Sequence, residues 1–149
     1  MLRKKEYVCL ALVAATVCVA VTRIFTMPRR IVIHWNFNGV PDKYSDKTFI
    51  LIMPVISALT WIFLRLCEKH PRMYNFPFKV TDEMSAGKIM NKFMYWVRLI
   101  LLSMILYLTV CMAGMIHLSD PCMYSATATL LLLIAVATVK VYRNEKRQI

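Results

Sequence analysis

Residues 99–116, LILLSMILYLTVCMAGMI, form a run without a single charged side chain. An uncharged run of about 18 or more residues is typical of a helix that crosses the hydrocarbon core of a bilayer. Arg98 precedes this run and His117 follows it, so polar residues mark both of its ends. Hydrophobic residues make up 59% of the 149-residue chain, well above the average for soluble domains. The stretch therefore predicts a membrane protein.

Three more uncharged blocks accompany it, at residues 7–22, 48–64 and 121–139. The first block is short, because sixteen residues extend about 24 Å as a helix and the hydrocarbon core is about 30 Å thick. Arg23 lengthens this span, since its long side chain can reach back to the membrane surface. We predict an all-α membrane protein, a single membrane domain over 1–149, with four transmembrane helices at 7–27, 48–67, 93–116 and 121–141.

The basic residues predict the orientation. The amino-terminal tail, the basic loop 68–92 and the carboxy-terminal tail hold three, five and four Lys or Arg residues, against four in the segment 28–47. Basic residues accumulate on the cytoplasmic side of membrane proteins. We therefore predict a multi-pass protein of the cell (cytoplasmic) membrane with both termini in the cytoplasm. The net charge of +11 follows from this topology, so membrane lipids are expected partners and nucleic acid is not.

The parts near the cytoplasmic side allow further predictions. Arg65 and Glu68 lie three residues apart, so they are expected to pair on one helix face. Thr81 and the acidic residues after it are typical of a helix start. The helix that follows has two interpretations: an amphipathic segment along the membrane surface, or an extension of the third span that packs on the bundle.

The five cysteines are scattered over the chain without the spacing of a metal site or a disulfide framework. We interpret them as small buried hydrophobic residues, and we expect no cofactor and no metal centre formed by them.

The segment 28–47 is expected to be a short irregular extracytoplasmic cassette between the first two helices. If its first part is extended, Ile31, Ile33 and Trp35 point to one side and the residues between them to the other. Turns are predicted at Asn38-Gly39 and at Pro41-Asp42. Ser45 or Thr48 is expected to cap the next helix, and Asp120 the last one. Arg23 is expected to pair with Asp42 or Asp120.

The cassette also carries a motif: Ile33-His34-Trp35-Asn36, Gly39, Pro41-Asp42 and Ser45-Asp46-Lys47. It resembles the domain of unknown function 1648 found in SdpI-like bacterial membrane proteins. Such relatives protect the producing cell against a secreted antimicrobial peptide, or hold a transcriptional regulator at the membrane. We expect this chain to hold the 1648-type unit without the further membrane domain of those relatives. The resemblance implies a binding site at His34, Trp35, Asn36, Gly39, Pro41 and Asp42.

We therefore predict a non-enzymatic protein that binds a peptide or protein partner, an antimicrobial peptide or a membrane-held regulator, through this cassette. Arg29 and Arg30, with Trp35 and Phe37, are candidate docking residues for an amphipathic peptide or a lipid headgroup. One alternative is a transporter or transport accessory, against which stands the lack of a carboxylate inside any predicted span. Another is a small enzyme or a metal site that uses the histidines and aspartates expected outside the cell, which are His34, Asp42, Asp46, His117 and Asp120. No catalytic residue is assigned, and the sequence leaves the oligomeric state open.

Overall fold

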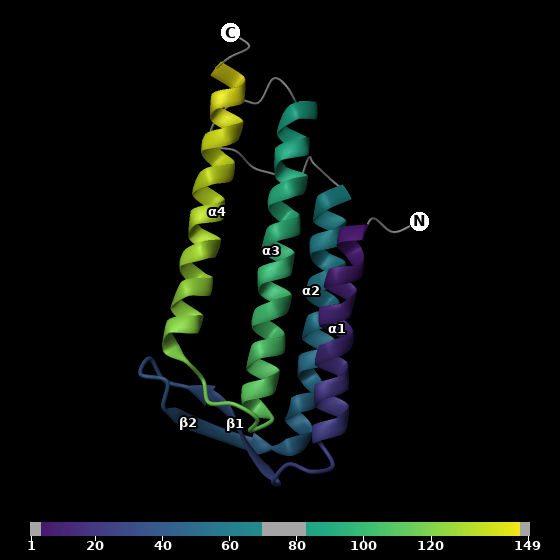
Figure 1. Cartoon of the computed structure of the whole chain (residues 1–149), viewed down its shortest axis with the longest axis vertical. Coiled ribbons are helices and arrows are strands. Elements are labelled where there is room, and N and C mark those ends of the chain that lie inside the picture. Colours follow the sequence, from purple (N-terminus) through teal and green to yellow (C-terminus); the bar gives the residue numbers. More distant parts are fainter. Residues whose placement is uncertain (1–3, 70–82, 147–149) are drawn as a thin grey trace.

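The computed structural model describes residues 4–69 and 83–146. Four long helices form a bundle, and a two-stranded sheet lies across one of its ends (Figure 1). Helix α1 begins and α4 ends at the opposite end. We call these the hairpin end and the terminal end. The elements in chain order are α1 (Lys4–Arg23), β1 (Arg30–Trp35), β2 (Pro41–Asp46), the 3-10 helix η1 (Lys47–Leu51), α2 (Ile52–Lys69), α3 (Glu83–Met112) and α4 (Asp120–Lys146).

All four helices are long and apolar enough to cross a membrane. Their outward faces carry large exposed hydrophobic side chains, among them Leu59, Phe63 and Leu131. Exposed apolar surface of this extent is unfavourable in water and favourable against lipid. The predicted four-helix membrane fold is therefore confirmed, and the beginning of α1 and the end of α4 lie on one side of it.

Helix α3 is the centre of the bundle, since it packs against each of the other three helices. Helix α4 packs mainly against α3, and it stands at the edge of the bundle in Figure 1. Its spanning part is the least buried of the four. The surface between α3 and α4 is therefore open along much of its length.

The stretch 83–92, assigned from the sequence to the basic loop, forms the first turns of α3. Ala86 and Met90 are buried there against Ala137 and Val141 of α4. The interpretation as a helix extension packed on the bundle is thus confirmed. The expected helix start at Thr81 and Asp82 lies outside the described residues.

Two paired strands occupy the segment that was expected to be irregular. Strands β1 and β2 form an antiparallel hairpin, with irregular register between Val32 and His34 and between His34 and Trp35. Ile31 is buried in the cluster at the hairpin end, and Ile33 and Trp35 pack against that cluster. The predicted alternation is therefore confirmed, and the hairpin is fixed to the bundle through its apolar face.

Helix α3 ends in a hydrogen-bonded cap at the hairpin end. Gly114 has a φ of +67°, and the amides of Gly114 and Met115 donate to the carbonyls of Cys111 and Val110. This is the Schellman motif, whose left-handed residue is usually glycine. The guanidinium of Arg23 donates to the carbonyl oxygen of Ala113 at 3.1 Å, which suits a cation at a helix C-terminus.

The expected pairing of Arg23 with Asp42 is therefore wrong, because a helix-end carbonyl takes its place. The side chain of Asp120, the other expected partner, lies outside the described part of the chain.

The start of the second membrane helix is capped by Asp46, where Ser45 or Thr48 was expected. Its carboxylate accepts from the amide and the hydroxyl of Thr48, at 3.0 and 2.9 Å. The backbone hydrogen bond, then the hydroxyl hydrogen bond, holds the pKa of Asp46 below its ordinary value. A charged cap at this position favours the first turn of η1.

Candidate functional site

The tip of the hairpin is organised by Asn36. Its side-chain oxygen accepts from the amides of Asn38 and Val40, both at 3.0 Å. Its own backbone amide donates to Val40, and its carbonyl oxygen accepts from Gly39, whose φ is +68°. A three-residue hairpin loop of this kind requires a left-handed residue at its last position, and glycine adopts it without strain. Asn36 and Gly39 therefore shape the turn.

His34 and Asp42 come together across the hairpin. The Nδ1 atom of His34 lies 2.5 Å from Oδ1 of Asp42, and both side chains are exposed to a substantial degree. The strand register pairs Trp35 with Pro41 and His34 with Lys43, so Asp42 is the extra residue between these two pairs, next to His34. The structure thus brings all six motif residues into one hairpin: two form the pair, two shape the turn, and two are strand partners.

The tip presents apolar side chains away from the bundle. Phe37 is 92% exposed, and Val40 and Tyr44 are also exposed. The tip is nevertheless fixed, since the hydroxyl of Tyr124 on α4 donates to the carbonyl oxygen of Phe37 at 2.8 Å. An aromatic side chain held at a defined place and left uncovered is the kind of residue that dominates protein interfaces.

A cavity of about 450 Å³ lies between the hairpin and the helices. Its walls come from β1, the start of α2, the end of α3 and the first turn of α4, and they are almost entirely apolar. Among the lining residues that the structure describes, His34 is the only titratable one. The hairpin end therefore combines an exposed aromatic tip, an apolar cavity and one polar pair within a single surface.

The candidate docking residues separate into two groups. Arg29 and Arg30 are exposed, and Arg29 lies 3.7 Å from the carboxylate of Asp46. Trp35, which was expected beside them, packs instead on the apolar cluster beneath the hairpin. The burial of the apolar face of β1 explains this, because Trp35 lies on the same side as Ile31. Phe37 alone remains as the exposed aromatic docking residue of the four.

The residues considered for a metal site are only partly brought together. His34 meets Asp42, while His117 lies exposed after the end of α3. Within residues 4–69 and 83–146, no three His, Cys, Asp or Glu side chains that the structure describes gather closely enough to hold a metal ion.

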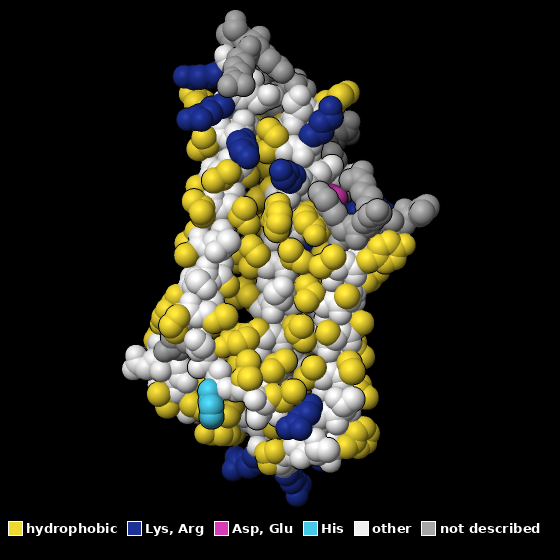
Figure 2. Space-filling view, in the orientation of Figure 1, with side chains coloured by type: hydrophobic (Ala, Val, Ile, Leu, Met, Phe, Trp, Pro, Cys, Tyr) yellow, Lys and Arg dark blue, Asp and Glu magenta, His cyan; other side chains and the backbone are white. Residues whose placement is uncertain are grey.

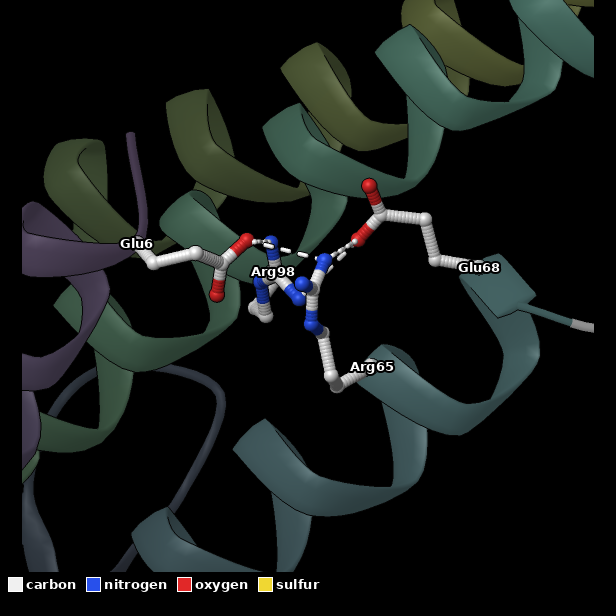
Figure 3. A network of polar contacts seen from close by, with 4 residues as sticks. All are labelled: Glu6, Arg65, Glu68 and Arg98. Carbon is white, nitrogen blue, oxygen red and sulfur yellow. Dashed lines mark hydrogen bonds and ion pairs between the residues drawn. The ribbon is translucent and has the colours of Figure 1, made fainter. Parts of the chain in front are cut away.

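A second group of polar residues lies inside the bundle toward the terminal end. Glu6 of α1, Arg65 and Glu68 of α2, and Arg98 of α3 point toward one another (Figure 3). Arg98 donates to Glu6 at 2.7 Å and lies 3.2 Å from Glu68. Arg65 contacts the same two carboxylates, at 3.1 and 3.0 Å. We call these four residues the charge cluster.

The pair at the centre of the charge cluster is deeply buried, since Arg98 is 1% exposed and Glu6 is 2% exposed, while Glu68 and Arg65 are partly buried. Two cations and two anions balance one another, and each guanidinium bridges both carboxylates. Buried charges of one sign are very unfavourable without such partners. The cluster therefore joins three helices, and each of its charges depends on the others for compensation.

Sequence reasoning found only part of this cluster. The pairing of Arg65 with Glu68 is confirmed. Glu6 was assigned to the tail, and Arg98 was interpreted as a marker of membrane orientation. The statement that no span contains a carboxylate is wrong, because Glu6 and Glu68 lie within the candidate spans. The sequence did hold a signal for this cluster. Its acidic and basic members lie at similar depths, near the ends of three spans that are expected on the same side of the membrane.

Comparison with known families agrees with the resemblance noted in the sequence. Residues 11–58 match the family described as Domain of unknown function (DUF1648). The matched segment covers most of α1, the whole hairpin and the start of α2. No curated protein and no solved structure shows significant similarity to the chain.

Proposed function

The chain carries the domain of unknown function 1648 over residues 11–58 of a multi-pass membrane protein. We propose that it is a non-enzymatic binding protein that captures an amphipathic peptide or protein segment at its hairpin end. The hairpin end faces the outside of the cell in this proposal, and the terminal end faces the cytoplasm. The role follows the SdpI-like relatives, in immunity against a membrane-active peptide or in signalling.

The observation that carries the proposal is the combination of exposure and fixation at Phe37. An exposed aromatic residue on a mobile loop loses conformational entropy when it binds. Here the turn hydrogen bonds of Asn36 and the hydrogen bond from Tyr124 hold the tip before any partner arrives. Preorganisation of this kind lowers the cost of binding.

The chemistry of the surroundings defines the class of partner. The apolar cavity beneath the hairpin accepts hydrophobic side chains, while Arg29 and Arg30 at the base of the hairpin and Lys43 on β2 give this end of the molecule positive charge. An amphipathic segment with an apolar face and acidic residues matches this surface. Electrostatic attraction of that kind raises the association rate and is weakened by salt.

The proposal is tested by measuring the binding of a synthetic panel of amphipathic peptides, half acidic and half basic, to the protein in lipid nanodiscs. The decisive variant is Phe37→Ser. Its matched control is Phe25→Ser, which removes a phenylalanine that is 81% exposed near the same end but outside the hairpin. We expect acidic peptides to bind the wild type, and Phe37→Ser to weaken binding by at least tenfold, about 1.4 kcal/mol or more.

The control variant should bind as the wild type does. Equal losses in the two variants would assign the phenylalanines to general membrane contact, and would refute the hairpin as the binding surface. Binding of no panel peptide by the wild type would also contradict the proposal.

A second candidate function, transport or a transport accessory role, is favoured by one observation. Carboxylates within membrane spans are the groups that proton-coupled transporters use, and Glu6, which is buried, and Glu68, which is partly buried, are such groups. This function predicts that Glu6→Gln abolishes a proton flux into liposomes that contain the wild-type protein. The binding function predicts no such flux from either protein.

A further inference from the structure

The open surface between α3 and α4 contains a cavity of about 260 Å³ toward the terminal end. Three lysines line it: Lys88 and Lys92 from α3, and Lys140 from α4. The remaining lining residues are hydrophobic, with the rings of Phe93 and Trp96 among them. Figure 2 shows basic side chains gathered over this part of the bundle, with hydrophobic side chains between and below them.

The positions of the lysines differ from what membrane orientation alone requires. A positive-inside signal needs basic residues near the span ends and is indifferent to the helix face that carries them. Lys88 and Lys92 are four residues apart, so they lie on one face of α3, and Lys140 meets them from α4. None of the three forms an ion pair with an acidic side chain that the structure describes.

We propose that this cavity is a binding site for one anionic glycerophospholipid from the leaflet at the terminal end. The phosphate contacts the three ammonium groups, and an acyl chain lies in the groove against Phe93, Trp96 and Val136. Basic pockets between membrane helices bind anionic headgroups in this way. Lysine suits the role because its aliphatic stem packs on apolar surface while its ammonium group reaches the headgroup level.

The dimensions of the groove agree with a lipid of one leaflet. From Lys88 to Trp96 the helix rises about 12 Å, and one leaflet contributes about half of a 30 Å hydrocarbon core. The groove continues beyond Trp96 and Leu133, because both residues also line the next cavity along α3 and α4, of about 470 Å³. An acyl chain therefore has an apolar path from the lysines toward the middle of the membrane.

The positive charge of the three lysines favours a lipid over a second copy of the chain as the occupant of this cavity. A helix from a second copy would bring apolar side chains to the groove and leave three lysines together without an anion. A phosphate neutralises them, and like charges grouped without a counterion repel one another. The complementarity of charge therefore favours the phospholipid.

The test is native mass spectrometry of the full-length protein in detergent, titrated with phosphatidylglycerol or with phosphatidylcholine of the same acyl chains. We expect the wild type to bind phosphatidylglycerol more tightly than phosphatidylcholine. The variant Lys88→Gln/Lys92→Gln/Lys140→Gln should lose this preference. Since each lysine near an anionic group contributes about fivefold, the loss should be on the order of a hundredfold.

The matched control removes the same charge from the other end of the molecule, as Arg29→Gln/Arg30→Gln/Lys43→Gln. It should keep the preference for phosphatidylglycerol. An equal loss in both triple variants would show a general effect of net charge and would overturn the proposal. A lysine variant that binds phosphatidylglycerol as the wild type does would overturn it as well.

Two further arms test the contribution of the acyl chain. Val136→Trp fills the groove from an exposed position and should weaken phosphatidylglycerol binding with the lysines intact. Glycerol 3-phosphate, a headgroup without chains, should not displace the lipid. Displacement by glycerol 3-phosphate would show that the site binds a phosphate group and not a whole lipid. If the wild type is a dimer and Val136→Trp dissociates it, the groove is occupied by a second copy of the chain. Either result would contradict the lipid site.

Discussion

Two polar side-chain pairs in this protein have nearly equal lengths and very different surroundings. His34 and Asp42 lie 2.5 Å apart on the exposed hairpin, and Arg98 and Glu6 lie 2.7 Å apart inside the bundle. Exposed pairs contribute little because water screens them and competes for both partners. Removal of one partner from a buried pair leaves an uncompensated charge, which is costly. Distance alone therefore does not tell which pair the fold depends on.

The difference separates two roles within one small bundle. The exposed polar groups of the hairpin end are expected to tolerate change, which is consistent with the proposed recognition of a partner there. The charge cluster connects α1, α2 and α3 at the other end, and we expect the fold to depend on the balance of its charges. The predictions below follow this contrast.

The largest effect is expected for Arg98→Leu. This change leaves Glu6 buried at 2% exposure with only Arg65 beside it, and it removes one of the two cations from Glu68. Loss of one partner from a buried pair costs about 3–5 kcal/mol. The free energy of unfolding in mixed micelles, followed by circular dichroism, should fall by about that amount.

The double variant Glu6→Leu/Arg98→Leu is the control for this prediction. It leaves Arg65 and Glu68 paired with each other, and neutral pairs of similar volume often replace buried ion pairs without loss. The double variant should therefore be more stable than Arg98→Leu alone. A double variant as unstable as the sum of the two single variants would contradict the account of the cluster.

A smaller and local effect is expected for Asn36→Ala. The change removes the acceptor of two turn amides, worth about 1–2 kcal/mol. Amide hydrogen exchange at Val40 should accelerate by roughly tenfold, while the bundle amides stay unaffected. Asn38→Ala is the matched control, because in the described hairpin only the backbone of Asn38 contributes to this network. Faster exchange in α2 or α3 would not fit a local role.

A still smaller effect on stability is expected for Asp42→Asn. The pair with His34 is exposed, and such pairs contribute less than about 1 kcal/mol. The thermal midpoint of unfolding should stay within a few degrees of the wild type. A loss as large as that of Arg98→Leu would remove the contrast between the two ends.

The smallest effect is expected at acidic pH, where the cap formed by Asp46 is lost. Asp46 has a pKa below its ordinary value of 3.8, because its charged form accepts the hydrogen bonds of Thr48. Its stabilisation of the helix start is therefore present above that value and is lost as the pH falls through the lowered pKa. Exchange of the Thr48 amide should accelerate below that lowered pKa. In Asp46→Asn, which keeps the acceptor but does not titrate, this acceleration should be absent.

The sequence was sufficient for the helices and for the motif, because long uncharged runs and alternating residues are local signals. The uncharged run at 99–116 was enough to identify a membrane span, and Ile31 and Ile33 were enough to orient β1. Of the two predicted turns, the one at Asn38-Gly39 is confirmed, since Gly39 adopts the left-handed conformation there. The turn predicted at Pro41-Asp42 is wrong, because β2 begins at Pro41 and the backbone of both residues is extended.

Contacts between residues far apart in the sequence could not be predicted from local patterns. The pairing of Glu6 with Arg98 joins residues 92 positions apart, and no periodicity reports it. Arg23 was expected to pair with a carboxylate, but its guanidinium donates to a carbonyl oxygen at the end of α3. The hairpin was not predicted because β2 is a polar strand with little hydrophobic alternation, and it pairs with β1 through its backbone.

The central claim is that the hairpin end binds a partner while the charge cluster maintains the fold. The most direct test is survival of cells that express the protein during challenge with membrane-active peptides from neighbouring bacteria. The wild type is compared with Asn36→Ala/Asp42→Ala at equal abundance in the membrane. The account predicts that the wild type protects and that the hairpin variant, still folded, does not. Equal protection by the two proteins, or none by the wild type, would contradict it.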